Sequence, residues 1–416
     1  MNILLIHQNV PGQYKHLARW LADTGQHRIV FLTQRRQFPP MPGITVVPYT
    51  PDHKPAENAY GLSSYYEACC AAGYKVARMC AKLDAEGFRP DVVIGHCGWG
   101  EMLFIKDVWP DAPMMCLFEY FFTASGGLVG FDPEYPASPN APFLTRARNA
   151  VHYMSYGLCD AGHTATKWQR NTFPRHFHDK IKVVHEGVPT GDLKPNPQAK
   201  VELGRLGREV TRADEIFTFA ARNLEPARGF HVFMRALPRI LARRPEARAV
   251  IIGASDVSYG SKPGESGGYR AAMEREVGQS IDWERVHFVG QVPYDLFTEV
   301  LQLSRCHVYL TAPFVLSWSL LEAMSVGATV VASGTPPVRE VIEDGKTGFL
   351  VDFFSPEDLA ERVAEVLAHE DNHAAIGRAA RNHVVRSYDF ATVCLPAFLA
   401  HLNGILPRRH RLVAGR

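Results

Sequence analysis

Short runs of apolar, mostly β-branched residues alternate with helix-patterned stretches along this 416-residue chain, and no other feature restricts the fold as strongly. Strands that are apolar on both faces are typical of parallel sheets that helices cover on both sides. The expected strands are Ile3 to Ile6, Ile29 to Leu32, Ile44 to Val47, Val92 to Ile94, Met114 to Phe118, Ile181 to Val184, Phe217 to Ala220, Ala249 to Ile252, Val286 to Val289, His307 to Leu310, Thr329 to Ala332 and Phe349 to Val351. Residues 14–21 and 230–241 show the apolar spacing of three and four that predicts helices between strands.

About a dozen strands are more than one open sheet usually holds. The segment from Pro189 to Pro197 is the richest in helix and strand breakers, so we divide the chain there. The sequence therefore predicts an α/β protein with two Rossmann-like, doubly wound domains, 1–188 and 189–388, that face each other across a cleft. Residues 389–416 are expected to form a helix and a basic tail that pack back on the first domain. In such folds the ligand crevice lies at the carboxyl ends of the strands.

Composition excludes several classes of protein. Lys plus Arg number 45 against 43 for Asp plus Glu, which removes the overall electrostatic argument for a nucleic-acid partner. The eight cysteines form no C-x-x-C pair, so neither a zinc site nor a disulfide framework is indicated, and a reducing compartment is favoured. The amino terminus shows no charged leader or long apolar stretch, and we expect a cytoplasmic protein.

The carboxyl-terminal tail is basic. Arg408, Arg409, Arg411 and Arg416 all follow the last acidic residue, Asp389. The tail is a candidate for peripheral contact with the anionic inner face of a membrane. The alternative is a solvated chain end.

Three familiar phosphate-handling signatures are missing from the sequence. No G-x-G-x-x-G follows a strand, no G-x-x-x-x-G-K-[ST] occurs, and no two aspartates form D-x-D. We therefore expect no dinucleotide cofactor and no metal site. A protein that handles a diphosphate without a metal must neutralise it with arginine, lysine, backbone N–H groups and helix amino termini.

Two arginines in the second half suit that task. Arg222 follows a predicted strand and Arg228 precedes a predicted helix, so both guanidinium groups are expected at the crevice. The planar guanidinium donates two parallel hydrogen bonds to a phosphate and stays charged. The alternative is that both arginines only pair with Glu225 on a surface loop.

A second segment, from Thr311 to Gly327, follows a buried strand and opens a helix. The N–H groups near Ser317, Trp318 and Ser319 would point at an anion. Glu322, one turn into the helix, would accept hydrogen bonds from two ribose hydroxyls. The alternative is a capping box, Ser319-x-x-Glu322, in which the glutamate serves its own helix.

These motifs resemble the donor-binding domain of retaining glycosyltransferases of the GT-B fold, family 4, also called group 1. The resemblance covers roughly residues 215–390, and the first half more loosely. It is carried by the Arg222 and Arg228 pair, Gly253 after Val250-Ile-Ile, the segment Phe288-Val-Gly-Gln-Val292, the stretch Leu321 to Ala332, and the turn and strand from Val341 to Val351. The resemblance implies that Gly253 lies at the donor site and that the backbone at Gly290 and Val292 contacts the nucleotide base.

In the first half, the segment from Asp91 to Glu101 resembles the strand and loop that deliver a histidine to the reaction centre of that family. The matching residue is His96, which would hydrogen-bond the sugar or help take the acceptor proton; the alternative is a structural histidine. Gly12 matches the family's glycine turn after the first strand, or is a plain strand-to-helix turn. Glu119 and Tyr120 lie in a loop expected to face the acceptor with aromatic platforms, unless these rings belong to the core.

The resemblance implies a metal-independent, retaining transfer of a sugar from a UDP- or GDP-linked donor to an acceptor hydroxyl. Arg222, Arg228 and the helix start would stabilise the departing diphosphate. The acceptor would be a glycan, a lipid-linked molecule or a small molecule, in surface polysaccharide or glycoconjugate synthesis, and no cofactor is needed.

Phe314 stands where the family's E-x7-E pattern has its first glutamate, which lies beside the transferred sugar. Two alternatives therefore stay open. One is a catalytically inactive relative that binds a nucleotide sugar and partners an active transferase. The other is a GT-B epimerase or phosphorylase.

Overall fold

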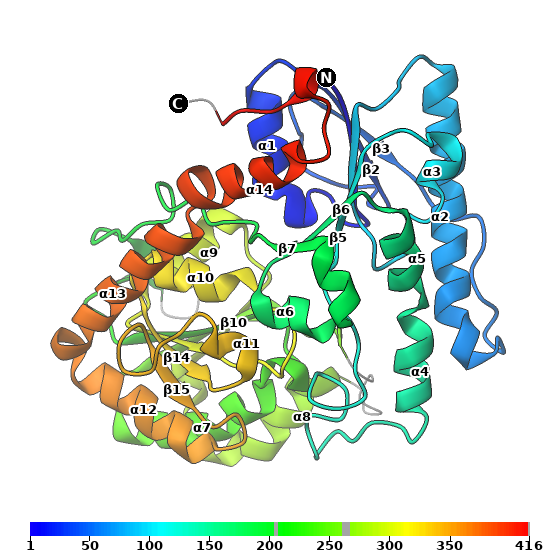
Figure 1. The fold of residues 1–416 in the computed structure, drawn as a ribbon. Coiled ribbons are helices and arrows are strands. Elements are labelled where there is room, and N and C mark those ends of the chain that lie inside the picture. The colour runs from blue at the N-terminus through cyan, green and yellow to red at the C-terminus, as the bar shows by residue number, and fades with distance from the viewer. Residues whose placement is uncertain (204–206, 260–266, 415–416) are drawn as a thin grey trace. The chain divides into compact units, whose positions relative to one another are not determined.

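The computed structural model describes residues 1–203, 207–259 and 267–414 (Figure 1). The chain forms two compact units. Unit 1 consists of Met1–Val129, Ala137–Gly187 and Phe390–Arg416, and unit 2 consists of Gly130–Pro136 and Val188–Asp389. Arg416, the last residue of the predicted basic tail, lies outside the described residues.

Unit 1 is built on a parallel sheet of seven strands in the order β3-β2-β1-β4-β5-β6-β7. The strands are β1 (Asn2–Ile6), β2 (Arg28–Thr33), β3 (Ile44–Pro48), β4 (Val92–His96), β5 (Met114–Leu117), β6 (Ala161–Thr164) and β7 (Ile181–Val183). The strand order reverses between β1 and β4, which is where doubly wound sheets bind ligands.

Helices cover both faces of this sheet. They are α1 (Lys15–Asp23), α2 (Gly61–Ala85), α3 (Ile105–Val108), α4 (Ala141–Arg148), α5 (Ala150–Leu158), α6 (Lys167–Thr172) and α14 (Leu395–Asn403), with short helical turns η1 (Gly12–Tyr14), η2 (Arg175–Asp179), η6 (Phe390–Cys394) and η7 (Arg408–His410). Ile3 and Leu5 pack on one face of the sheet, in a core that includes Leu402 of α14. Leu4 and Ile6 pack on the opposite face. Figure 1 shows α14, in red, beside α1, so the chain's last long helix completes unit 1.

Unit 2 repeats this design with a parallel sheet of six strands in the order β12-β11-β10-β13-β14-β15. The strands are β10 (Ile216–Asn223), β11 (Arg248–Ala254), β12 (Val286–Gly290), β13 (Cys306–Tyr309), β14 (Thr329–Ser333) and β15 (Phe349–Val351). A separate antiparallel pair joins β8 (Lys200–Leu203) to β9 (Arg208–Thr211). Here the order reverses between β10 and β13.

The helices of unit 2 again cover both sheet faces. They are α7 (Phe230–Arg243), α8 (Gly268–Val277), α9 (Tyr294–Leu303), α10 (Trp318–Ser325), α11 (Pro336–Arg339), α12 (Pro356–Ala368) and α13 (Glu370–Tyr388), with the turns η3 (Pro226–Arg228), η4 (Gly278–Ser280) and η5 (Trp283–Arg285). Phe217 and Phe219 of β10 pack against α7 in one core, and Ala220 of the same strand packs with Val300 of α9 in another. Two parallel, helix-covered sheets are the architecture that the apolar runs predict.

One segment differs from the predicted division. Residues Gly130–Pro136 were expected in the first domain, but they belong to unit 2. Their side chains explain this: Asp132 pairs with His231 of α7 at 3.0 Å, and Glu134 binds Arg235 of the same helix through two contacts of 2.7 and 2.8 Å. Such contacts between residues about 100 positions apart leave no local pattern in the sequence.

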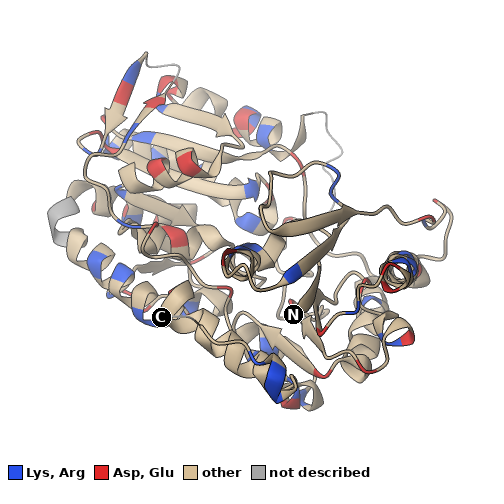
Figure 2. Ribbon diagram, turned by 90° about the horizontal axis from the view of Figure 1, so that it is seen from above, with Lys and Arg blue, Asp and Glu red and all other residues tan. Residues whose placement is uncertain are grey.

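Positive and negative side chains are interspersed along both units (Figure 2). Among the described residues, no helix combines the length and the apolar character needed to cross a membrane.

Candidate functional site

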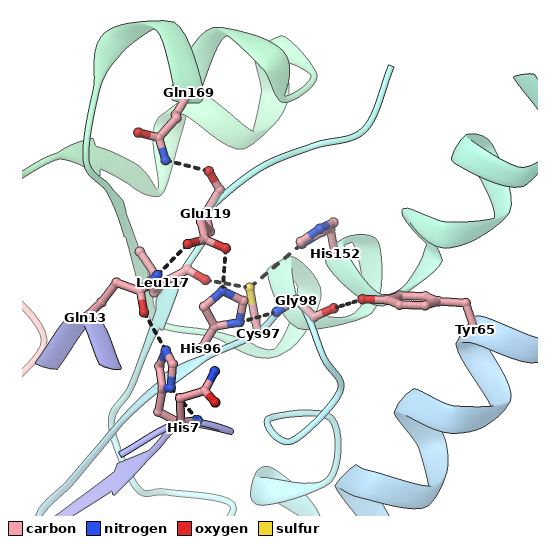
Figure 3. Close-up of polar contacts among 11 residues, drawn as sticks. His7, Gln13, Tyr65, His96, Cys97, Gly98, Leu117, Glu119, His152 and Gln169 are labelled. Carbon is pink, nitrogen blue, oxygen red and sulfur yellow. Dashed lines mark hydrogen bonds and ion pairs between the residues drawn. The ribbon is translucent and has the colours of Figure 1, made fainter. Parts of the chain in front are cut away.

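Polar side chains gather at the carboxyl ends of the strands in unit 1, where the order of the sheet reverses (Figure 3). His7 directly follows β1, and His96 is the last residue of β4. Glu119 lies two residues beyond β5. Because the carboxyl ends of parallel strands meet at one edge, these residues from distant parts of the sequence become neighbours.

His96 is almost completely buried, with 2% of its side chain exposed, and both of its ring nitrogens are engaged. The backbone N–H of Gly98 donates to Nδ1 at 3.1 Å, and Nε2 lies 3.3 Å from Oε2 of Glu119. A neutral imidazole has one donor and one acceptor nitrogen, so the proton resides on Nε2 and is donated to Glu119. The ring also stacks on Trp99, with centroids 3.7 Å apart.

Hydrogen bonds to both ring nitrogens also fix the orientation of His7. The backbone N–H of Asn9 donates to Nδ1 at 2.9 Å, so Nε2 carries the proton and donates to Oε1 of Gln13 at 2.6 Å. The amide nitrogen of Gln13 then donates to Oε1 of Glu119. Burial lowers the pKa of His7 to about 3, and the nearby His96 acts in the same direction. His7 is therefore neutral at neutral pH.

Glu119 is the point where these contacts meet, as the dashed lines in Figure 3 show. Each carboxylate oxygen receives a donor, one from Gln13 and one from His96. The side-chain amide of Gln169 also donates to the backbone carbonyl of Glu119 at 2.7 Å. The Glu119 side chain keeps 22% of its surface exposed, so a ligand in solution can reach its carboxylate.

Gly12 and Tyr120 help to hold this network in place. Gly12 has a φ of 50°, and a Cβ atom placed there would overlap the His7 ring. The absence of a side chain therefore makes room for the histidine. The Tyr120 ring is only 3% exposed and stacks on Trp168, and its hydroxyl accepts the N–H of Leu128. In this conformation Tyr120 braces the loop after β5 and does not present a ring face to solvent.

In unit 2 the corresponding edge holds Arg228, which is 8% exposed. One terminal nitrogen of its guanidinium donates to Oγ1 of Thr311 at 2.8 Å and to the carbonyl of Val315 at 3.0 Å. The rings of Tyr259 and Phe314 flank the guanidinium, with centroids 5.4 and 5.8 Å from Cζ. Phe314 is thus buried beside a cation in this structure.

The structure does not support the alternative in which Arg222 and Arg228 only pair with Glu225 on a surface loop. Glu225 is fully buried, and its carboxylate accepts the backbone N–H groups of Ser258 and Tyr259 at 3.0 and 2.8 Å. Burial raises the pKa of this carboxyl group. Within the described part of the chain, neither arginine forms an ion pair with it. Arg222 is exposed near the carboxyl end of β10.

The third element of the unit 2 site is the start of α10. The helix begins at Trp318 with Ser317 as its N-cap, so Ser319 lies inside the helix and the capping-box alternative does not fit. The Ser317 N–H donates to the Tyr309 hydroxyl at 2.8 Å. Glu322 is 6% exposed, and its Oε1 accepts the hydroxyl of Tyr294 at 2.6 Å.

The remaining predicted donor residues lie at the ends of neighbouring strands. Gly253 is near the end of β11, where a Cβ atom would come within 2.6 Å of the Ala221 carbonyl. Gly290 ends β12, and Val292 follows it and packs against the core next to α9. The described residues contain no group of three or more His, Cys, Asp or Glu side chains placed to hold a metal ion.

Within unit 1, His96 lies beside Glu119, and Gly12 lies against His7; within unit 2, Arg228 lies beside the loop that opens α10. Sequence reasoning missed His7 and Gln13, and it assigned no role to Tyr259 or Tyr294. The position of His7 directly after the first strand was a usable signal, because that position reaches the ligand edge of a doubly wound sheet.

Two family descriptions match the chain. "Glycosyl transferase family 4 group" matches residues 25–193, and "Glycosyl transferases group 1" matches residues 207–383. The first match lies mainly in unit 1 and the second lies in unit 2.

Named relatives agree with these matches. The phosphatidyl-myo-inositol mannosyltransferase of Mycobacterium tuberculosis is 30% identical over an alignment that covers 63% of this chain and 71% of the relative. The GDP-mannose-dependent alpha-(1-6)-phosphatidylinositol monomannoside mannosyltransferase of the same organism is 28% identical, with 80% of this chain and 84% of the relative covered.

Solved structures share the fold. HepE from Anabaena, solved with UDP and glucose, superposes with a TM-score of 0.69 at 15% identity, covering 97% of this chain and all of its own. Sucrose-phosphate synthase from Thermosynechococcus elongatus gives a TM-score of 0.70 at 17% identity, with 97% and 98% of the two chains covered. From the family matches, the relatives and this shared architecture together, the chain belongs to the group 1 glycosyl transferases of family 4 and is a glycosyltransferase of the GT-B type.

Proposed function

We propose that this enzyme moves a sugar from a nucleotide diphosphate sugar to an acceptor hydroxyl, with retention of the anomeric configuration and without a metal ion. One observation carries the donor half of the proposal: the buried guanidinium of Arg228, held by Thr311 and Val315 directly before α10. Arginine cannot be deprotonated in proteins, so this site keeps a positive charge in a place that water reaches poorly. A diphosphate is a ligand of the matching charge.

The departing diphosphate is where stabilisation is needed most. Breaking the anomeric C–O bond leaves negative charge on the phosphate and positive charge on the sugar ring. Arg222, Arg228 and the N–H groups of Trp318 and Ser319 at the start of α10 would share that negative charge. These groups supply the positive charge that a divalent cation supplies in other phosphate sites, and for that reason we propose metal-independent chemistry.

The rest of the donor would extend along the same edge of the unit 2 sheet. Glu322 would accept the ribose hydroxyls, and the Tyr294 hydroxyl that donates to it would hold the carboxylate in place. The backbone at Gly290 and Val292 would meet the nucleotide base, with Gly253 close to the phosphates.

The names of the relatives guide the choice of donor and acceptor. Two of them are mannosyltransferases, one is named as GDP-mannose-dependent, and both act on phosphatidylinositol compounds according to their names. HepE was solved with UDP. We therefore propose GDP-mannose as the first donor to test and a UDP-linked hexose as the second. The acceptor would be a lipid-linked molecule, a glycan or a small molecule in glycoconjugate synthesis.

Phe314 favours a second candidate function, a nucleotide-sugar-binding protein without turnover. A phenyl ring cannot accept a hydrogen bond from a sugar hydroxyl as a carboxylate does. The two candidates differ in one product: the active enzyme releases nucleoside diphosphate and forms a glycoside, whereas the inactive relative only binds the donor.

The decisive experiment combines binding with product analysis in the presence of EDTA. GDP-mannose and UDP-glucose are first compared by thermal shift, in which a donor at 100 times its Kd adds about 2.7 kcal/mol of stability. Each donor is then incubated with phosphatidylinositol or a free glycan, and products are analysed by chromatography and, in NMR, by the one-bond coupling between the anomeric carbon and its proton. We expect a glycoside of retained configuration.

Each other outcome overturns a stated part of the proposal. A donor that binds without any glycoside forming supports the inactive relative. Activity that EDTA abolishes and manganese restores contradicts metal independence. An inverted anomer contradicts retention.

A further inference from the structure

The polar network of unit 1 has a fixed direction, because backbone N–H groups set both histidine tautomers. Asn9 donates to His7, His7 to Gln13, and Gln13 to Glu119. From the other side, Gly98 donates to His96 and His96 donates to Glu119. Both series of hydrogen bonds therefore end on one carboxylate.

Resting on the proposed transfer reaction, we propose that Glu119 binds the acceptor hydroxyl and takes its proton, and that His7 and Gln13 are positioning residues that act through it. Two donors stabilise the ionised form of a carboxylate, so Glu119 would be a base rather than an acid at the start of the reaction. Its two oxygens are held in place by Gln13 in η1 and by His96 at the end of β4, which fixes the direction in which a third ligand can approach.

His96 is less suited to receive this proton. Its Nδ1 lone pair is occupied by the Gly98 N–H, and its Nε2 carries the hydrogen given to Glu119. Its side chain is also far less exposed than that of Glu119, at 2% against 22%. A base must come within hydrogen-bond reach of the proton it removes. The geometry gives that reach to Glu119 and makes His96 its orienting partner.

The acceptor oxygen approaches the anomeric carbon on the face from which the diphosphate departs, as retention requires. It forms a bond to that carbon as the bond from the carbon to the diphosphate oxygen breaks. The electron pair of the broken bond leaves with the diphosphate. The proton of the acceptor hydroxyl passes to a carboxylate oxygen of Glu119 and later to solvent.

Several titratable groups face Glu119 and enter any pH profile. They are His7 after β1, Tyr14 in η1, His96 and Cys97 at β4, His152 in α5 and Glu186 after β7. Burial lowers the pKa of His7 and of His152 to about 3, whereas burial raises the pKa of Glu186 to about 7. Glu186 would therefore titrate in the working range, so pH profiles are best measured in a Glu186→Gln background.

The first test compares two nucleophiles. A hydroxyl acceptor must lose a proton, but azide is already an anion and needs no base. Glu119→Ala should lower transfer to the hydroxyl acceptor about 100-fold, while formation of the glycosyl azide stays within about threefold of the wild type. Glu101→Gln is the control: it replaces a buried carboxyl group outside this network, whose Oε1 receives the Tyr49 hydroxyl at 2.8 Å.

The second test shifts the pKa of the proposed base but keeps the Glu119 carboxylate. Gln13→Glu places a like charge beside Glu119, which raises the pKa of the pair. The acid limb of the kcat/KM profile should shift upward by about one pH unit, whereas Gln13→Met, which removes one donor to Glu119 but adds no charge, should lower kcat about tenfold with a smaller upward shift. A merely structural role for Gln13 would lower activity equally in both variants and leave the limb in place.

The outcomes separate this inference from the proposed function. If Glu119→Ala keeps hydroxyl transfer near the wild-type rate, or loses azide transfer equally, or if the acid limb does not move, Glu119 is not the proton acceptor. If the wild-type protein binds neither GDP nor UDP and forms no glycoside, the proposed function itself is wrong. Binding of nucleoside diphosphate that is unchanged in Glu119→Ala shows that only the acceptor step was altered.

Discussion

Arg228 keeps its charge in a buried position because its surroundings offset much of the cost of leaving water. Two oxygen acceptors, from Thr311 and Val315, receive hydrogen bonds from one terminal nitrogen, and two aromatic rings flank the guanidinium. Cation–π contacts of this kind contribute on the order of 1 kcal/mol each. The same contacts fix the orientation of the fork, so an incoming phosphate meets a donor group that is already in place.

Gly12 offers a prediction at the same scale. Gly12→Ala should cost about 1 to 2 kcal/mol of stability because φ is positive, and it should also lower turnover because the new Cβ overlaps the His7 ring. Gly25→Ala is the control: its φ is 63°, and a Cβ atom added there would meet nothing within 4 Å. In urea unfolding, Gly12→Ala should lose at least as much stability as Gly25→Ala because of the added overlap with His7, but only Gly12→Ala should lose activity. Equal activity in the two variants would show that His7 does not depend on Gly12.

At the scale of elements, α14 belongs to unit 1, although every residue of unit 2 comes before this helix in the chain. Leu395, Phe398 and Leu402 insert into the core that contains Ile3 and Leu5. The first unit therefore cannot complete its core until the carboxyl terminus has been made. Helix packing of this kind comes from the apolar stripe of the helix rather than from its intrinsic propensity.

Leu402 tests the importance of this packing. Because the side chain is fully buried, Leu402→Ala should lower the free energy of unfolding by about 2 to 5 kcal/mol. Ala397→Ser, on the exposed face of the same helix, should change it by less than about 0.5 kcal/mol. Urea unfolding followed by circular dichroism measures both. A loss below about 1 kcal/mol in Leu402→Ala would mean that the packing of α14 contributes little to the stability of unit 1.

The apolar runs were sufficient to predict most strands of both sheets, β1 and β13 among them, because buried parallel strands are rich in β-branched residues. β6 was not predicted, since Ala161–Thr164 reads Ala-Gly-His-Thr and carries a single β-branched residue. Its strand character comes from pairing with β5 and β7. Tertiary pairing of this kind overrides local propensity.

The residues of the candidate site also fall into those that the sequence could predict and those that it could not. Arg228 and Glu322 could be predicted because they belong to motifs of fixed spacing within one stretch of chain. The link from His7 through Gln13 to Glu119 could not, because it joins the end of β1 to the end of β5 across the sheet. Which strand ends become neighbours is decided by the strand order, and the order is a property of the folded sheet.

At the scale of the whole molecule, buried neutral histidines make stability depend on pH. Burial lowers the pKa of four of them to about 3 and of a fifth to about 4: His7, His152, His163, His307 and His185. In the unfolded chain each titrates near 6.5. Between these values the unfolded state binds more protons than the folded state, so stability falls as the pH falls.

We therefore expect the free energy of unfolding to change little between pH 7 and about pH 8 and to decrease from about pH 6.5 toward pH 4. Each unit of pKa difference corresponds to about 1.4 kcal/mol for one histidine. The raised pKa values of three buried glutamates, Glu101, Glu186 and Glu225, act in the opposite direction, but they are fewer than the five histidines. Urea unfolding at pH 7.5, 6, 5 and 4 measures the trend. An unfolding free energy that stays level down to pH 4 would show that these histidines are not held neutral.

Titration calorimetry with GDP and UDP in EDTA measures whether unit 2 binds a diphosphate through Arg228. We predict that the wild-type protein binds at least one of the two nucleotides and that Arg228→Ala weakens binding by tenfold or more, about 1.4 kcal/mol. Arg239→Ala, which removes a half-exposed arginine paired with Glu357, should bind like the wild type. Equal affinity in Arg228→Ala and the wild type, or binding of neither nucleotide, would contradict the account.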